Sequence, residues 1–257
     1  MIMLDGADYD QQWLIDKARD DDFYYGALNK IALSSSSLKM LLDSPKTFYN
    51  VQTYGSNESS PALLQGRIIH TMILEPHRFD DIFEVVDVAS KNTKKYKEAQ
   101  ASTSKTCITT KDLQQGERIV DAFQRNEHAK YFLKQSQTEK PMVDMLGGFP
   151  FRAKADIWND SFLADIKTTT DLKAFRYSAD KYSYDMQCYL YCNLFQRSYK
   201  DWYFIVLDKA SCDIGIYDVS EEFYKRGEAK FNRAIAIYKD FFVKDNDLDS
   251  YIIRDTL

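Results

Sequence analysis

Two short segments in which apolar and charged residues alternate lie next to each other near the middle of the chain, FRAKADIW at 151–158 and FLADIK at 162–167. In a β-strand successive side chains point to opposite faces, so each segment would have one apolar and one charged face. With the connection centred after residue 160, Asp156 stands directly opposite Asp165. The pattern therefore predicts a β-hairpin with two facing acids, and Lys167 shares the face of Asp165.

Two facing carboxylates repel each other in a sheet unless a cation lies between them. Oxygen ligands of this kind favour Mg²⁺ or Mn²⁺ over zinc. A metal activates bound water, and a neighbouring lysine can orient that water or stabilise developing negative charge. Asp156, Asp165 and Lys167 thus form the smallest set that metal-dependent phosphodiester hydrolysis requires. The alternative is that they are solvated charges on the open face of an ordinary hairpin, and spacing alone leaves both interpretations open.

Three side chains on predicted helices are further candidates. Gln187 and Tyr191 are four residues apart and share one helix face, from which they could contact a phosphate or the lysine. Tyr191 could equally pack in the core while Gln187 caps a strand edge. His70 lies in the middle of another helix, where a lone histidine is more often a packing residue than a ligand. The residues alone do not decide between these roles.

The pattern around the hairpin predicts an α/β fold with a central mixed β-sheet flanked by helices. Serine caps and prolines mark one short helix that stops before Pro45 and a second that begins at Pro61. The lysine-rich stretch 91–105 is predicted to be a mobile loop. Residues 1–30 are predicted to be a partly ordered arm or short helix, ahead of a single domain at 31–257. The other expected elements are a strand at 81–88, a long helix at about 110–134 capped by Thr110, strands at 140–146, 202–208 and 213–219, a helix at 184–196 and a final helix at 220–244.

The composition limits the class of protein. The net charge of −5 disfavours nonspecific nucleic-acid binding by a uniformly basic surface, but it permits a local basic groove with bound divalent cations. The sequence has no run of about 18 apolar residues and no signal peptide, so a cytoplasmic location without membrane contact is expected. The four cysteines lack C-x-x-C spacing and are expected to be buried free thiols. They are Cys107, Cys188, Cys192 and Cys212.

Taken together and in this order, these residues resemble the RecB-like branch of the PD-(D/E)XK nuclease superfamily. Within it the chain is most similar to the RecE-type (exodeoxyribonuclease VIII) nuclease domains. The resemblance covers about residues 31–195 and implies a restriction-endonuclease-like core with N-terminal helices. The matching stretches are LSSSSLKMLLDSP, LLQGRIIHTMILEP with its G-x-x-x-H, KTCITTKDLQQG, FRAKADIW, LADIKTTTDLKAF and YSYDMQCYLY.

The resemblance implies a role for each candidate residue. Lys167 would be the catalytic lysine, with Gln187 and Tyr191 holding the scissile phosphate or the lysine. Ser36 would lie near the DNA 5′ phosphate. The implied metal ligands are Asp156, Asp165, the main-chain carbonyl of Ile166, His70 and Glu139.

The resemblance also implies an activity and partners. The expected enzyme is a Mg²⁺-dependent (or Mn²⁺-dependent) exonuclease that degrades one strand of linear double-stranded DNA from the 5′ end and leaves a 3′ tail for recombination. A ring-shaped homo-oligomer, a single-strand annealing protein as partner, and a bacterial or phage-infected cell are expected. The alternatives are an endonuclease or flap nuclease on the same fold and a DNA-binding module without catalysis.

Overall fold

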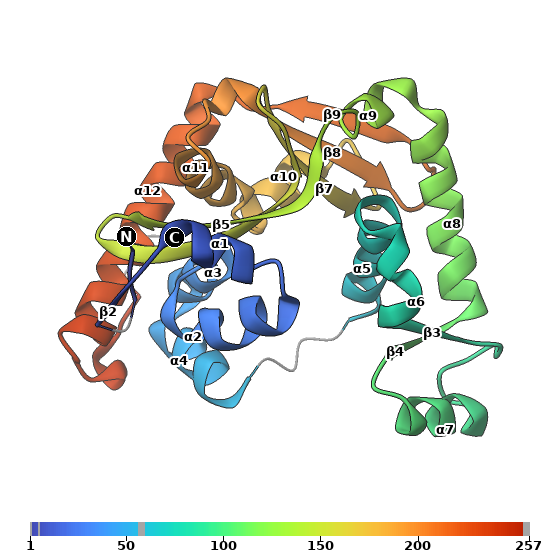
Figure 1. The fold of residues 1–257 in the computed structure, drawn as a ribbon, viewed down its shortest axis with the longest axis horizontal. Coiled ribbons are helices and arrows are strands. Elements are labelled where there is room, and N and C mark those ends of the chain that lie inside the picture. The colour runs from blue at the N-terminus through green and yellow to red at the C-terminus, as the bar shows by residue number, and fades with distance from the viewer. Residues whose placement is uncertain (1, 5, 56–59, 254–257) are drawn as a thin grey trace.

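A five-stranded mixed β-sheet forms the centre of the molecule (Figure 1). The computed structural model describes residues 2–4, 6–55 and 60–253. The strands follow one another in chain order across the sheet; β7 and β8 are parallel, and the other neighbours are antiparallel. The predicted fold class is therefore confirmed. The strands of the sheet are β5 (Gln137–Leu146), β6 (Phe149–Trp158), β7 (Leu163–Thr169), β8 (Trp202–Asp208) and β9 (Ile214–Asp218), and two smaller pairs are β1 (Ile2–Leu4) with β2 (Ala7–Tyr9) and β3 (Phe83–Val86) with β4 (Thr106–Thr109).

The hairpin β6–β7 has the register that the alternating pattern predicts, because Ile157 pairs with Ala164. The ladder of paired residues ends there. At the next position of β6, Asp156 has no paired residue on β7. Instead, its side-chain Oδ2 accepts a hydrogen bond of 2.8 Å from the backbone N–H of Ile166 on β7. The hairpin therefore fixes the Asp156 side chain against the strand that carries Asp165.

Helices cover both faces of the sheet (Figure 1). α3, α11 and α12 enclose one apolar core, to which Leu163 of β7 belongs. α5, α8 and α9 enclose the other, in which Ala164 and Ile166 are buried. Alternate side chains of β7 thus lie in opposite layers. The helices are α1 (Gln11–Lys17), α2 (Leu28–Ile31), α3 (Ser35–Asp43), α4 (Pro45–Tyr54), α5 (Pro61–Leu74), α6 (Phe79–Ile82), α7 (Lys94–Ser102), α8 (Thr110–Arg125), α9 (Glu127–Tyr131), α10 (Phe175–Lys181), α11 (Tyr184–Leu194) and α12 (Glu221–Tyr238).

The predicted stop before Pro45 is confirmed, whereas two later helix boundaries differ from the prediction. The stop expected before Pro45 is the junction of α3 and α4, where the Ser44 hydroxyl accepts from the N–H of Lys46 and proline suits the first helical position. The long helix expected at 110–134 is two helices, since Asn126 ends α8 and caps α9. The final helix is also shorter as an α-helix, because it changes to a π-turn after α12.

The prediction of a mobile loop at 91–105 is wrong. Most of this stretch is helix α7, which Thr93 caps through a 3.3 Å hydrogen bond from the N–H of Tyr96 to its Oγ1. Tyr96 is the buried residue of α7, so no apolar stripe marks the helix in the sequence. The N-cap of α8 is likewise Thr109 rather than Thr110, because Asp112 completes a capping box with it.

The N-terminal residues pack on the sheet. The hairpin β1–β2 and the helices α1 and α2 bury Leu4, Leu14 and Leu28 in one cluster with Val143 of β5. The predicted division of the chain after residue 30 stays a prediction. None of the described helices has both the length and the apolar character that crossing a bilayer requires.

The same N-terminal segment covers the charged face of β6. Lys154 Nζ lies 2.5 Å from Asp21 Oδ1, and Arg152 donates a hydrogen bond to the side chain of Asn29. Arg152 and Lys154 are only 6% and 9% exposed. The charged face of β6 is therefore covered by protein at Arg152 and Lys154. On this face, only the end of the strand near Asp156 is available for a site.

The four cysteines are free thiols. Cys107, Cys188 and Cys192 are buried, as expected. Cys212 is half-buried, in the connection between β8 and β9, so the prediction of burial is wrong for it.

Candidate active site

Strand β7 and helix α11 bring three of the candidate residues together. Asp165 is buried, and its Oδ2 lies 2.6 Å from Nζ of Lys167, two residues later on the same face of the strand. The other oxygen, Oδ1, accepts a hydrogen bond of 2.6 Å from Nε2 of Gln187 on α11. Both oxygens of Asp165 are thus held from different sides, and Gln187 fixes the orientation of the carboxylate.

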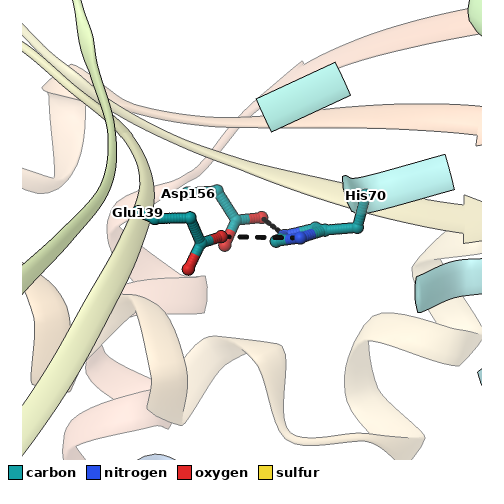
Figure 2. A group of neighbouring side chains, drawn as sticks. All are labelled: His70, Glu139 and Asp156. Atoms are coloured by element: carbon teal, nitrogen blue, oxygen red, sulfur yellow. Dashed lines mark ion pairs between the residues drawn. The ribbon is translucent and has the colours of Figure 1, made fainter. Parts of the chain in front are cut away.

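A second group lies at the adjoining end of β6 and consists of His70, Glu139 and Asp156 (Figure 2). His70 comes from α5, and its Nε2 is 3.0 Å from Oδ2 of Asp156. Its Nδ1 is 3.5 Å from Oε1 of Glu139. One ligand atom from each of the three residues lies within 4.8 Å of the other two. The helix histidine is therefore placed between two carboxylates.

Glu139 has an unusual backbone for a strand residue. Its φ is +50°, in the left-handed region that residues other than glycine rarely adopt. The ladder between β5 and β6 has no pair at this position, although Thr138 pairs with Ile157 and Lys140 with Ala155. Such a conformation costs about 1–3 kcal/mol and is kept where a site needs it. Here it accompanies the approach of the Glu139 carboxylate to His70.

Burial and mutual repulsion shift the pKa values of these groups. Burial raises the pKa of Asp165 to about 6, although Lys167 opposes the change. Burial also raises the pKa of Glu139 to about 8 against the attraction of His70. Burial alone would lower the pKa of His70, but the charge and hydrogen bond of Asp156 outweigh it and raise that pKa to about 9. The site thus has three carboxyl groups and two cationic side chains, His70 and Lys167, and Glu139 keeps its proton up to about pH 8.

The residues fit a divalent cation. Glu139 Oε1 is buried and accepts no hydrogen bond from any residue that the structure describes. Carboxylate oxygens with raised pKa values gain most from a bound cation, because it replaces the missing positive charge. Asp156 and Asp165 with Glu139 would supply oxygens, and His70 would supply a nitrogen in place of its present ion pairs.

A cleft of about 910 Å³ opens beside these groups. Its wall includes His70, Ile166 and Lys167, together with the hydroxyl-bearing residues Thr168–Thr170 at the end of β7. Among the described lining residues, four are lysine or arginine and none is acidic, although the chain as a whole is acidic. The full lining is Lys39, Ser60, Ala62, Leu63, Gly66, Arg67, His70, Ile166, Lys167, Thr168, Thr169, Thr170, Ser178, Tyr182, Tyr184 and Lys209.

Sequence reasoning missed three of these cations, Lys39, Arg67 and Lys209. They come from α3, α5 and the connection after β8, so no local spacing marks them. It also missed Tyr184, whose ring lies 4.6 Å from Lys167 Nζ. Tyr184 lies 17 residues after Lys167 in the sequence, so only the fold brings the two side chains together in one cleft.

Two predicted site residues, Ser36 and Tyr191, belong neither to the lining of the cleft nor to the two groups of side chains beside it. Ser36 is exposed in the first turn of α3, one turn before the cleft residue Lys39. Tyr191 is buried, and its hydroxyl donates a 3.3 Å hydrogen bond to the carbonyl of Lys154. That contact holds α11 against β6 two residues before Asp156. The catalytic roles of Ser36 and Tyr191 stay predictions, as does metal binding by the Ile166 carbonyl.

Residues 34–247 match a protein family described as a PDDEXK-like domain of unknown function (DUF3799). The chain belongs to this PDDEXK-like family. Two solved structures resemble the PDDEXK-like chain. A candidate exonuclease from Eubacterium rectale is 17% identical, with 93% of this chain and 95% of that chain covered and a TM-score of 0.64, which supports the fold. A phage-related exonuclease from Haemophilus somnus 129PT is 13% identical over 86% of this chain and 99% of that one, with a TM-score of 0.36. No curated protein matches the chain.

The metal-free PDDEXK-like protein is expected to lose thermal stability as the pH rises. The stabilisation from His70 is fully present below its usual pKa of 6.5 and is lost as the pH rises through about 9. Glu139 acts in the same direction, because the folded protein binds its proton up to about pH 8, whereas the unfolded chain releases it near 4.5. Thermal melting in EDTA at a series of pH values checks this. Glu139→Gln should flatten the dependence, and an unchanged slope in that variant would contradict the assignment.

Proposed function

We propose that this PDDEXK-like protein is a metal-dependent DNA exonuclease that hydrolyses phosphodiester bonds of linear double-stranded DNA. The proposed direction is 5′ to 3′, which leaves 3′ single-stranded tails. The main support is the meeting of Asp156, Asp165 and Lys167 beside a cleft that carries four basic side chains and no acidic one among its described lining residues. A cleft of this charge suits a polyanion, and the acids suit the cation that its cleavage needs.

The proposed chemistry assigns a task to each group. Mg²⁺ or Mn²⁺ bound by Asp156 and Asp165 would supply water activation and charge neutralisation when present. Lys167 keeps its positive charge, since the nearby carboxylates raise its pKa despite burial, so it orients the attacking water rather than deprotonating it. The water oxygen forms the new bond to phosphorus and gives up a proton to solvent, the bond to the leaving sugar oxygen breaks, and that oxygen takes up a proton from solvent. Gln187 is a positioning residue, because it acts through Asp165.

The remaining basic residues of the cleft bind the nucleic acid. Lys39, Arg67 and Lys209 would contact phosphates on either side of the scissile bond. Ser36, one turn before Lys39, is proposed to lie near a 5′ phosphate. The homo-oligomeric ring and the single-strand annealing partner stay predictions from the resemblance to RecE-type domains.

End-labelled linear duplex and closed circular duplex, each incubated with the protein in Mg²⁺ or Mn²⁺, test the proposed activity. We expect digestion of the linear DNA from its ends and an intact circle. Nicking or linearisation of the circle would show an endonuclease instead. A protein that binds both DNAs and cleaves neither would be a binding module, and the proposal would then be wrong.

A further inference from the structure

The lysine-rich stretch that folds as α7 forms a positively charged projection on an acidic protein. We define the lysine lobe as residues 83–109, that is β3, α7, β4 and the segments that join them. It contains five lysines and three acidic residues, a net charge of +2, whereas the whole chain carries −5. In Figure 1 the lobe lies at the end of the arm of the molecule that holds α5 and α8.

The lobe is an ordered part of the structure. The hydroxyl of Tyr96 donates a 2.5 Å hydrogen bond to the carbonyl of Cys107, which ties α7 to β4. Val86 completes a small apolar cluster with these two residues. Lys91 Nζ pairs with Asp112 Oδ2 at 3.2 Å and joins the lobe to the start of α8. The position of α7 is therefore fixed relative to the main body.

The outer surface of α7 carries exposed lysine side chains, with Glu98 and Gln100 exposed among them. Lys94, Lys95 and Lys97 are exposed, and the side chain of Lys94 is 89% exposed even though it lies 3.6 Å from Glu98. An exposed ion pair of this kind stabilises a helix by only a few tenths of a kcal/mol. Lys97 takes part in no ion pair with the residues that the structure describes. Lys94 and Lys97 also line a shallow hollow on the helix surface.

Arg67 connects the lobe with the cleft. Its side chain lines the cleft beside His70, and its Nη1 donates a 3.3 Å hydrogen bond to Oγ1 of Thr106 on β4. The guanidinium also lies 5.5 Å from the ring of Phe83 on β3. Positive charge thus continues from the cleft, through Arg67, to the strands that carry α7.

We propose that the lysine lobe binds the phosphate backbone of duplex DNA outside the cleft. This proposal rests on the proposed function. It specifies that the double-stranded part of the DNA substrate is the ligand of the lysine lobe. Duplex DNA carries about one negative charge per 1.7 Å of its axis, so several exposed lysines on one rigid helix can each contact a phosphate. Lysine contacts of this kind hold DNA without reading its sequence.

Three glutamine substitutions on α7 test the assignment. The variant Lys94→Gln, Lys95→Gln, Lys97→Gln is compared with the wild-type protein by fluorescence anisotropy, with a blunt duplex of about 30 base pairs and EDTA to prevent cleavage. We expect binding to weaken by about tenfold at moderate salt and the slope of log K against log salt to fall by about two to three. Cleavage of the same duplex in Mg²⁺ should show a higher KM and an unchanged kcat.

Two matched variants provide the controls. Lys200→Gln, Lys225→Gln, Lys244→Gln removes the same charge from exposed lysines elsewhere and should bind DNA like the wild type. Lys94→Arg, Lys95→Arg, Lys97→Arg keeps the charge of the lobe and should also bind like the wild type. Thermal melting verifies that all three variants are folded. Equal weakening in the control triple, or failure of the arginine variant to bind, would overturn the proposal.

These experiments distinguish a failure of the lysine-lobe proposal from a failure of the proposed nuclease function. A wild-type protein that cleaves no DNA, together with loss of duplex binding in the glutamine variant of α7, would refute the nuclease function and support the lobe. Cleavage by the wild type with unchanged binding by that variant would overturn the lobe and leave the nuclease function standing. A wild-type protein that binds an acidic polypeptide such as polyglutamate but no duplex DNA would also overturn the proposal.

Discussion

Lys167→Ala is expected to lower the rate of DNA cleavage by about 10²–10³-fold, because the proposed function assigns to this lysine the orientation of the attacking water and the stabilisation of charge on the phosphate. Lys167 Nζ is 2.6 Å from Asp165 Oδ2, so the substitution also removes the cation that pairs with this buried carboxylate. Single-turnover digestion of end-labelled linear duplex at saturating Mg²⁺ measures the effect on the chemical step.

Lys173→Ala is the matched control for this experiment. Lys173 is an exposed lysine six residues further along the chain, outside the lining of the cleft. Its substitution should leave the single-turnover rate within about twofold of the wild type, since an exposed lysine outside the cleft makes no contact that strengthens in the transition state. Full activity of Lys167→Ala would mean that the catalytic lysine has been assigned wrongly.

Gly227→Ala is expected to lower the free energy of unfolding by about 3 kcal/mol, although alanine is the better helix former. A Cβ atom at Gly227 of α12 would lie 2.1 Å from the carbonyl oxygen and 2.5 Å from the carbonyl carbon of Asp185 on α11. Backbone atoms cannot turn aside as a flexible side chain can, so the two helices would have to separate. Urea unfolding followed by tryptophan fluorescence measures the loss.

Gly26→Ala provides the comparison, because no atom beyond its chain neighbours and its own helix backbone lies within 4 Å of the Cβ that it would add. We expect that variant to unfold within about 1 kcal/mol of the wild type. The displacement in Gly227→Ala should also reach the site, since Gln187 follows Asp185 by two residues and holds Asp165. Equal urea midpoints for the two variants would show that α11 and α12 tolerate a wider separation than their contact suggests.

Local patterns were enough to predict the centre of the fold. The alternation in β6 and β7 and the short connection between them fixed the pairing of Ile157 with Ala164. Serine caps located α3 and α5, since the Ser34 and Ser60 hydroxyls accept from the first turns of these helices. Signals of this kind lie within a few residues of the structure that they determine.

Features that depend on distant parts of the chain were not predictable in this way. The alternating pattern indicated a charged face on β6, but nothing near Lys154 in the sequence indicated that Asp21 would cover it. Helix α7 has one buried side chain, so the hydrophobic periodicity that reveals most helices is missing. The cleft combines cations from four separate segments, and the left-handed backbone of Glu139 has no sequence signal at all.

The cover that the N-terminal residues form over β6 has a practical consequence for anyone who wishes to shorten the protein. The family match begins at residue 34, and a trimmed version starting there would look complete. It would lack Asp21 and Asn29, the partners of Lys154 and Arg152. Under the proposed function, Lys154, whose charge already acts on Glu139, would then compete with a divalent ion for that carboxylate, so weak metal dependence measured on a trimmed protein would reflect the missing cover.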